Sequence, residues 1–212
     1  MSSIETKSKI ISSAIMLFNQ HGLANVRLQM IADESGISIG NLAYHFKNKE
    51  AIVESTILSL QEEFSAILST FRQRNDFLDF DLQLDKFYFF IKDNPYFFFD
   101  AVDIKRNFPQ VSLFKGDCPS KLLYQIENRF TSNVKKGILK EEVIEGYYLQ
   151  LAHSIWGYIA FLVPQNFILK QGTPSLLAFK KHIWMQFIPH LTEKGKQEFL
   201  TLLSPILQIE LL

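Results

Sequence analysis

The chain has 212 residues, of which 47% are hydrophobic and 21% are charged. This is enough for one large or two small domains with a buried core, and the composition excludes fibrous and disordered classes. Basic and acidic residues balance at 22 each, so the chain lacks the strong positive charge of many nucleic-acid-binding proteins. No apolar run reaches the roughly 20 residues of a membrane-spanning helix. Because the start of the sequence also lacks the pattern of a signal peptide, we expect a cytoplasmic protein.

Glycine and proline residues divide the chain into segments whose apolar residues recur at helical spacing. No segment alternates polar and apolar residues as a half-buried strand does. The sequence therefore predicts an all-α protein. Its helices are expected at about 6–21, 28–35, 39–45, 48–71, 80–92, 95–108, 119–136, 141–163, 174–188 and 193–203.

Neither an enzyme nor a metal protein is expected. The sequence contains no zinc-protease, nucleophile-elbow or phosphate-loop motif, and its single cysteine, Cys118, excludes an intrachain disulfide. The histidines lack metal-ligand spacing, and acidic residues 141, 142 and 145 are typical of a helix start. We expect no cofactor and no bound metal.

The helices expected at 28–35 and 39–45 are joined by a short turn with Gly36 and Ser38, which is typical of a helix-turn-helix. Ser38 suits the N-cap of the second helix. The core between the helices is assigned to five apolar residues, which are Ile31, Ala32, Ile37, Leu42 and Phe46.

The outward face of the second helix has chemistry suited to DNA. Asn41 can bond adenine, while Ile39 and Ala43 can contact thymine methyl groups. Phosphate contacts are available to four further residues, Tyr44, His45, Lys47 and Lys49. The two lysines can equally be solvated surface charges.

Residues 22–50, GLANVRLQMIADESGISIGNLAYHFKNKE, closely resemble the DNA-binding signature of the TetR family of transcriptional regulators. The resemblance implies a homodimeric, ligand-responsive repressor with a three-helix DNA-binding domain at residues 1–47 and a helical effector-binding and dimerisation domain at 48–212. It implies DNA contacts by Arg27, Ser38, Gly40, Asn41, Tyr44, His45 and Lys49. Arg27, Ile39 and Ala43 depart from the common family pattern, which implies an altered operator preference.

Only three of the aromatic residues precede residue 51, so nearly all of the 20 Phe, 7 Tyr and 2 Trp belong to the C-terminal region. They fill a helical core, line an apolar effector cavity, or do both. We predict that such a cavity involves some of Phe90, Phe98, Tyr124, Phe130, Trp156 and Tyr158.

The helices expected at 141–163 and 174–188 are apolar on nearly every face, and such helices need cover on all sides. In the resembled family these positions form a four-helix bundle between two subunits, whereas burial within one subunit is the alternative. The predicted interface residues are Leu151, Ile155, Ile159, Leu176, Phe179, Ile183 and Phe187.

These observations favour a repressor that leaves a palindromic DNA operator when a small apolar or aromatic effector binds. The competing hypothesis is an all-α small-molecule-binding protein or enzyme without DNA binding, whose N-terminal helices are merely structural.

Overall fold

The computed structural model describes residues 3–71, 76–112 and 118–211. Within these ranges all regular elements are helical, and the only β-type contact is an isolated bridge between Leu139 and Leu191. The prediction of an all-α fold is therefore confirmed. None of the described helices is both long and apolar enough to cross a membrane.

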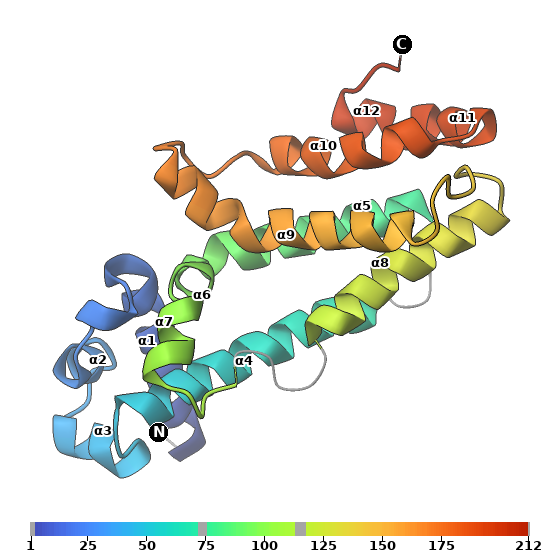
Figure 1. Cartoon of the computed structure of the whole chain (residues 1–212). Helices are drawn as coiled ribbons and strands as arrows, with labels where there is room; N and C mark the ends of the chain where they lie inside the picture. The colour runs from blue at the N-terminus through green and yellow to red at the C-terminus, as the bar shows by residue number, and fades with distance from the viewer. Residues whose placement is uncertain (1–2, 72–75, 113–117, 212) are drawn as a thin grey trace. The chain divides into compact units, whose positions relative to one another are not determined.

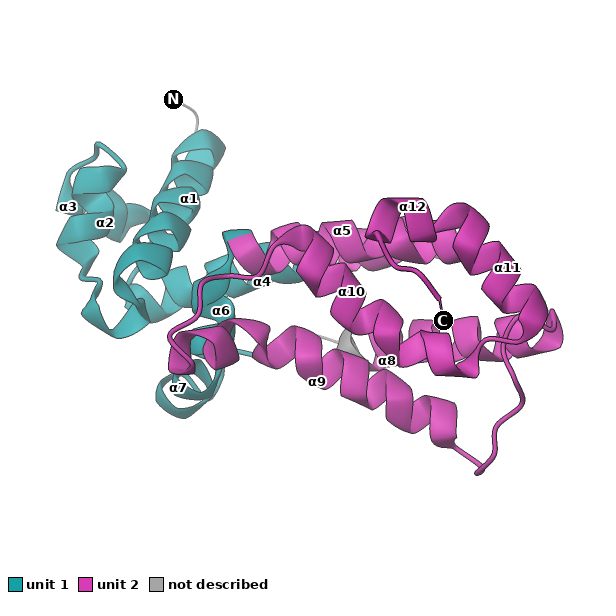
Figure 2. Ribbon diagram, turned by 90° about the horizontal axis from the view of Figure 1, so that it is seen from above, with its two compact units in different colours: residues 1–64, 93–116 teal, residues 65–92, 117–212 magenta. Residues whose placement is uncertain are grey.

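The chain forms two compact units, which Figure 2 distinguishes by colour. Unit 1 contains residues 1–64 and 93–116, and unit 2 contains residues 65–92 and 117–212. The long helix α4 (Lys49–Thr70) supplies residues to both. The division at residues 47 and 48 inferred from the family resemblance stays a prediction.

Unit 1 begins with α1 (Ser3–His21), the short 3-10 helix η1 (Leu23–Asn25), α2 (Leu28–Glu34) and α3 (Ile39–His45), before α4. The buried residues of α1 recur at steps of three and four and include Ile10, Ala14, Leu17 and Phe18. Gly22 ends α1 with a φ of 75°, a conformation that glycine adopts without a Cβ penalty. Asn48, where the sequence predicts the start of this helix, accepts a hydrogen bond of 2.9 Å from the Ala51 N–H and caps α4.

The single helix predicted at 95–108 is wrong, because the structure has two short helices there. These are α6 (Pro95–Phe99) and α7 (Ala101–Asn107), which meet at Asp100. The φ and ψ of Asp100 are −94° and 3°, outside the α-helical region. Its carboxylate accepts a hydrogen bond from the Leu23 N–H, a long-range contact that local spacing does not reveal.

Unit 2 contains α5 (Phe77–Asp93) up to Lys92, then α8 (Cys118–Lys135), α9 (Tyr147–Ile168), α10 (Leu176–Phe187), the 3-10 helix η2 (Ile188–His190), α11 (Glu193–Leu202) and α12 (Ser204–Leu207). Figure 1 shows α5, α9 and α10 running alongside one another. Trp184 lies fully buried among four phenylalanine rings at centroid distances of 5.2 to 5.8 Å, namely Phe77, Phe80, Phe187 and Phe199. Aromatic residues thus form much of this core.

The boundaries of α9 also differ from the predicted 141–163. The helix begins only at Tyr147, because Glu142 reaches forward as a cap and accepts hydrogen bonds from the N–H groups of Gly146 and Tyr148. It then continues past Pro164 to Ile168, although an interior proline removes one backbone hydrogen bond. Figure 1 shows a change of direction near this C-terminal end.

Candidate nucleic-acid interface and effector pocket

A left-handed turn joins α2 to α3. Gly36 has a φ of 62°, and its N–H donates to the Asp33 carbonyl at 3.0 Å. The Ile37 N–H donates to the Ala32 carbonyl at 3.0 Å, which completes a Schellman motif. A side chain at Gly36 would be strained in this conformation, so glycine fixes the angle between the two helices locally.

Ser38 begins α3 as predicted, since its hydroxyl accepts a hydrogen bond of 3.1 Å from the Asn41 N–H. Leu42 is fully buried and anchors the inner face of the helix. Ile31, Ala32 and Phe46 are also buried, whereas Ile37 is half-buried. The small core expected for a helix-turn-helix is present.

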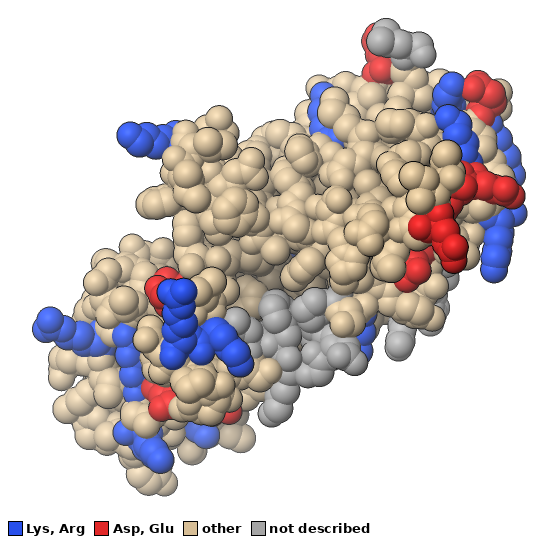
Figure 3. Space-filling model, viewed as in Figure 1, with Lys and Arg blue, Asp and Glu red and all other residues tan. Residues whose placement is uncertain are grey.

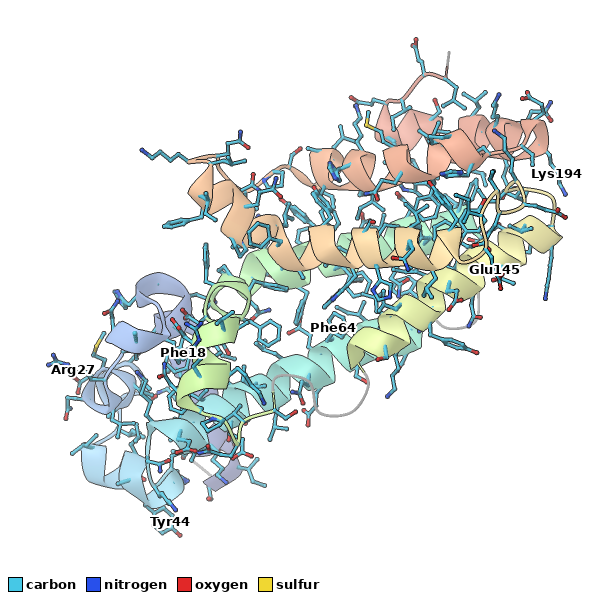
Figure 4. The ribbon with its side chains drawn as sticks, viewed as in Figure 1. Phe18, Arg27, Tyr44, Phe64, Glu145 and Lys194 are labelled. Atoms are coloured by element: carbon cyan, nitrogen blue, oxygen red, sulfur yellow. The ribbon has the colours of Figure 1, made fainter. Side chains whose placement is uncertain are left out.

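The outer face of α3 is exposed. Tyr44 has 81% of its surface exposed, and Figure 4 shows its ring projecting away from the helix. Its ring meets the edge of the half-buried His45 ring at a centroid distance of 5.2 Å. The other predicted contact residues of this helix are also exposed, namely Ile39, Gly40, Asn41 and Ala43. The structure thus brings together the side chains that the sequence assigned to DNA.

Basic side chains flank this face. Arg27 precedes α2 and is exposed, with no side-chain cap on that helix, and Lys47 is exposed just after α3. Figure 3 shows blue basic side chains, with few red acidic ones among them, on the visible face of unit 1. The acidic residues nearest α3 in the sequence are Asp33 and Glu34 at the end of α2 and Glu50 in the first turn of α4.

Lys49 is engaged inside the protein. Its ammonium group donates a 2.5 Å hydrogen bond to the Leu23 carbonyl. Partial burial lowers the pKa of Lys49, while the negative charge of Asp100 acts in the opposite direction. The predicted phosphate contact by Lys49 therefore competes with an internal contact, and Lys47 is the freer of the two cations.

Residues 10–56 match a family model described as "Bacterial regulatory proteins, tetR family". This range contains the whole of α2, the turn and α3. This N-terminal region of the chain is therefore a DNA-binding domain of the TetR type.

Curated relatives agree with the family assignment. The chain is 36% identical over 67 residues to the probable HTH-type transcriptional regulator YttP of Bacillus subtilis, an alignment that covers 32% of each protein. It is 32% identical over 106 residues to the HTH-type transcriptional regulator RutR of Escherichia coli, covering 50% of this chain and 44% of RutR. The chain thus spans less than half the length of these relatives.

Solved structures share the fold over nearly the whole chain. A TetR-family transcriptional regulator from Marinobacter aquaeolei has a TM-score of 0.79 at 23% identity, covering 95% of this chain and 97% of that one. A gamma-butyrolactone receptor described as ArpA-like has a TM-score of 0.69 at 13% identity, covering 98% and 99%. The likeness in fold therefore extends from the helix-turn-helix through the C-terminal helices.

A pocket of about 390 Å³ lies within unit 2, between the C-terminal end of α4 and α8. Its walls come from residues between Ser65 and Phe71 and between Lys121 and Lys135. The lining combines apolar surface with many polar side chains and includes the basic residue Arg129. No cluster of three metal-ligating side chains occurs among the residues that the structure describes.

Of the six predicted effector-binding residues, only Tyr124 lines this pocket. Phe90 and Phe130 are buried, and Phe130 stacks on Tyr148 and Phe187 at 4.6 and 4.8 Å. Phe98 belongs to unit 1, whereas Trp156 and Tyr158 are half-buried residues of α9. The structure does not gather the six into one lining.

Most of the predicted dimer residues lie inside the single subunit, so their place in an interface stays a prediction. Five of the seven residues are at most 4% exposed in the single subunit, because they lie on the inward faces of α9 and α10. These five are Ile155, Ile159, Phe179, Ile183 and Phe187. Leu151 and Leu176 are half-buried. The outward positions of these two helices are the ones that stay exposed in the single subunit.

Arg129 is a site residue that the sequence analysis missed. It is only 4% exposed and lies on the buried stripe of α8 with Leu122, Ile126 and Phe130. Its guanidinium is paired with Asp79 at 2.8 Å. The available sequence signal was a charged residue at an inward-facing position of an amphipathic helix.

Proposed function

We propose that the chain is a DNA-binding transcriptional repressor in which α3 enters the major groove. The observation that carries this proposal is the outward face of α3, with exposed Asn41 and Tyr44 on a helix anchored by buried Leu42. Asn41 would read adenine in the groove, and Lys47 and Arg27 would contact phosphates. Ser38, Ile39, Gly40, Ala43, His45 and Lys49 complete the proposed contact surface.

The proposed repressor acts as a homodimer through the outward faces of α9 and α10. On α9, Ser154, Gly157 and Phe161 are exposed and recur at steps of three and four, so they share one face. Ala178, His182 and Met185 do the same on α10. The His182 ring stacks on Tyr158 at 3.8 Å, which joins the two helices. Small residues beside Phe161 and Met185 suit close packing against an identical pair of helices.

A dimer of this kind reads a palindromic operator whose half-sites are about 34–36 Å apart. Binding of a small-molecule effector in the C-terminal region would favour a state in which α4 no longer holds the two recognition helices at this spacing. Ser65 near the pocket and Lys49 after α3 both belong to α4, so this helix connects the two ends of the proposed response. The effect is limited by the difference in effector affinity between the two states.

A mobility-shift assay on the DNA upstream of the gene tests the proposal. We expect salt-dependent binding by the wild type, and loss of binding by the double variant Asn41→Ala, Lys47→Ala. Lys181→Ala, a substitution on α10 in unit 2, is the matched control. If the wild type binds specific and random DNA equally weakly, the alternative of a small-molecule-binding protein without DNA recognition is supported instead.

A further inference from the structure

We propose that the pocket between α4 and α8 binds a small organic anion, with Arg129 as its central recognition residue and with Lys121 and Lys135, toward the two ends of α8, as flanking positive charges. The regulatory meaning of this pocket, as the effector site of the repressor, rests on the function proposed above.

Arg129 provides the central observation. Its Nη2 atom is fully used, because it donates to the Phe71 carbonyl at 3.1 Å, to Asp79 at 2.8 Å and to Gln83 at 3.3 Å. Its Nη1 atom is buried and has no hydrogen-bond partner among the described residues. A buried donor on a charged group is costly to leave unsatisfied. A ligand oxygen that reached Nη1 from the pocket would satisfy it.

The charge of the lining favours an anion. Besides Arg129 it contains Lys121 and Lys135, both exposed, and no acidic residue. Asp79 pairs with the guanidinium and offsets one of the three positive charges. Neither lysine has an ion pair among the residues that the structure describes, so an anionic group is attracted to the pocket.

The rest of the wall indicates a polar organic molecule. Leu68, Phe71 and Tyr124 offer apolar surface for a carbon skeleton, while Ser65, Asn128 and Ser132 offer polar side chains. The volume of about 390 Å³ lies at the small end of the range of ligand sites. We therefore assign an anionic effector to this site, in place of the apolar or aromatic effector expected from the sequence.

Guanidinium and ammonium groups bind carboxylates and phosphates alike, so the shared chemistry is an anionic oxygen group. The experiment measures the thermal unfolding of the full chain, without DNA, in increasing benzoate, benzamide or inorganic phosphate at constant ionic strength. Benzoate and benzamide have the same shape and differ in charge. We expect benzoate to raise the melting temperature and benzamide to leave it unchanged. If phosphate stabilises at lower concentration than benzoate, the preferred group is a phosphoryl anion, which also supports an anion site.

Variants of exposed lysines test anion binding without the risk of unfolding the protein. Arg129 holds several backbone and side-chain groups together, so its loss can unfold the protein, whereas Lys121 and Lys135 are exposed. Lys121→Gln with Lys135→Gln should weaken anion binding by about tenfold, and Lys181→Gln should leave it unchanged. Equal effects of benzoate and benzamide, no stabilisation by either anion, or anion binding unaffected in the double variant would overturn the proposal. Because no DNA is present, these results are independent of whether the chain binds an operator.

Discussion

The backbone N–H of Leu23 donates a 2.8 Å hydrogen bond to the carboxylate of Asp100, 77 positions later in the chain. Lys49 donates to the carbonyl of the same leucine, so both backbone groups of Leu23 are held by charged side chains. The side chain of Asn19 makes two further hydrogen bonds. Its amide nitrogen donates to the Asp93 carbonyl, and its amide oxygen accepts from the Tyr96 N–H. Within unit 1, these contacts fasten the segment around α6 to the end of α1 and to η1, just before the helix-turn-helix.

Replacing Asp100 tests this fastening. Asp100→Ala removes the acceptor of the Leu23 N–H and should lower the free energy of unfolding by about 1–3 kcal/mol. Asp100→Asn keeps an acceptor oxygen and should cost much less. Urea unfolding of the three proteins measures the difference. Equal stability of the alanine and asparagine variants would contradict a structural function for this hydrogen bond.

The same residue predicts a dependence on pH. Burial raises the pKa of Asp100, with Asp103 adding to the shift, while the Leu23 N–H and Lys49 oppose it. Because the pKa of Asp100 is higher in the folded state than in the unfolded state, the protonated carboxyl favours folding. This contribution to the free energy of unfolding is complete below the ordinary pKa of aspartate and is lost as pH rises through the raised pKa. Between these two pKa values, the free energy of unfolding of wild type should therefore fall relative to that of Asp100→Asn. Above the raised pKa, the difference between the two proteins should stay constant. Urea unfolding at a series of pH values measures this, and a constant difference throughout would contradict it.

Two substitutions of Ser38 distinguish its function as a helix cap from its proposed contact with DNA. Ser38→Ala removes the cap on the Asn41 N–H and should destabilise the protein by about 1 kcal/mol. Ser38→Asp keeps a good cap but places a negative charge on the proposed DNA face. We expect thermal unfolding near that of wild type for the aspartate variant, together with much weaker operator binding. If this variant binds DNA as tightly as wild type, Ser38 lies away from the phosphates.

Asn41 and Lys47 should affect DNA binding in different ways. Asn41→Ala should cost about 1–3 kcal/mol on the preferred operator and relax selectivity at one base pair. Lys47→Ala should weaken binding to all sequences and reduce the slope of log affinity against log salt by about 0.9, the value for one phosphate contact. Affinity titrations on operator variants at several salt concentrations distinguish these effects. A sequence-independent loss for the asparagine variant would exclude base reading by Asn41.

The parts of the fold that the sequence predicts are those governed by local chemistry. Gly36, Ser38 and Asn48 act within one helical turn of their own positions, and the structure has them as expected. The break at Asp100 depends on a partner 77 positions away, and the late start of α9 depends on the reach of Glu142. Neither leaves a signal in the apolar spacing.

The inward and outward faces of the C-terminal helices are harder to predict from the sequence for a related reason. Because α9 is apolar on nearly every face, its periodicity could not indicate that Ile155 and Ile159 face inward while Phe161 faces outward. The pocket was missed because an aromatic-rich composition does not distinguish a core from a cavity. Phe130 packs in the core, whereas Arg129 beside it lines the pocket.

A buried charge cluster in unit 2 should be essential for stability. The ammonium group of Lys180 lies 2.5 Å from Asp81 and 2.7 Å from Asp85, and Trp184 also donates to Asp81. Lys180→Met would leave the buried Asp81 without its cation, so we expect a loss of about 3–5 kcal/mol. Lys181→Met, at the adjacent half-buried position, is the control and should change stability little. Urea unfolding of both variants gives the comparison, and equal losses would contradict a special function for the cluster.

The dimer face proposed on the outward sides of α9 and α10 makes a prediction that differs from the one made by the buried residues. Phe161 is 51% exposed and Met185 is 59% exposed, so Phe161→Glu with Met185→Glu should leave the subunit folded while charge repulsion separates the proposed dimer. Light scattering should then give the mass of a monomer, with the helical circular dichroism retained. Leu200→Glu, at a residue of α11 that is 43% exposed, should leave the dimer intact. By contrast, Ile159→Ala removes a buried side chain and should lower stability by about 2–5 kcal/mol whether or not the subunits associate. A dimer that survives both glutamates would place the interface on another surface of the protein.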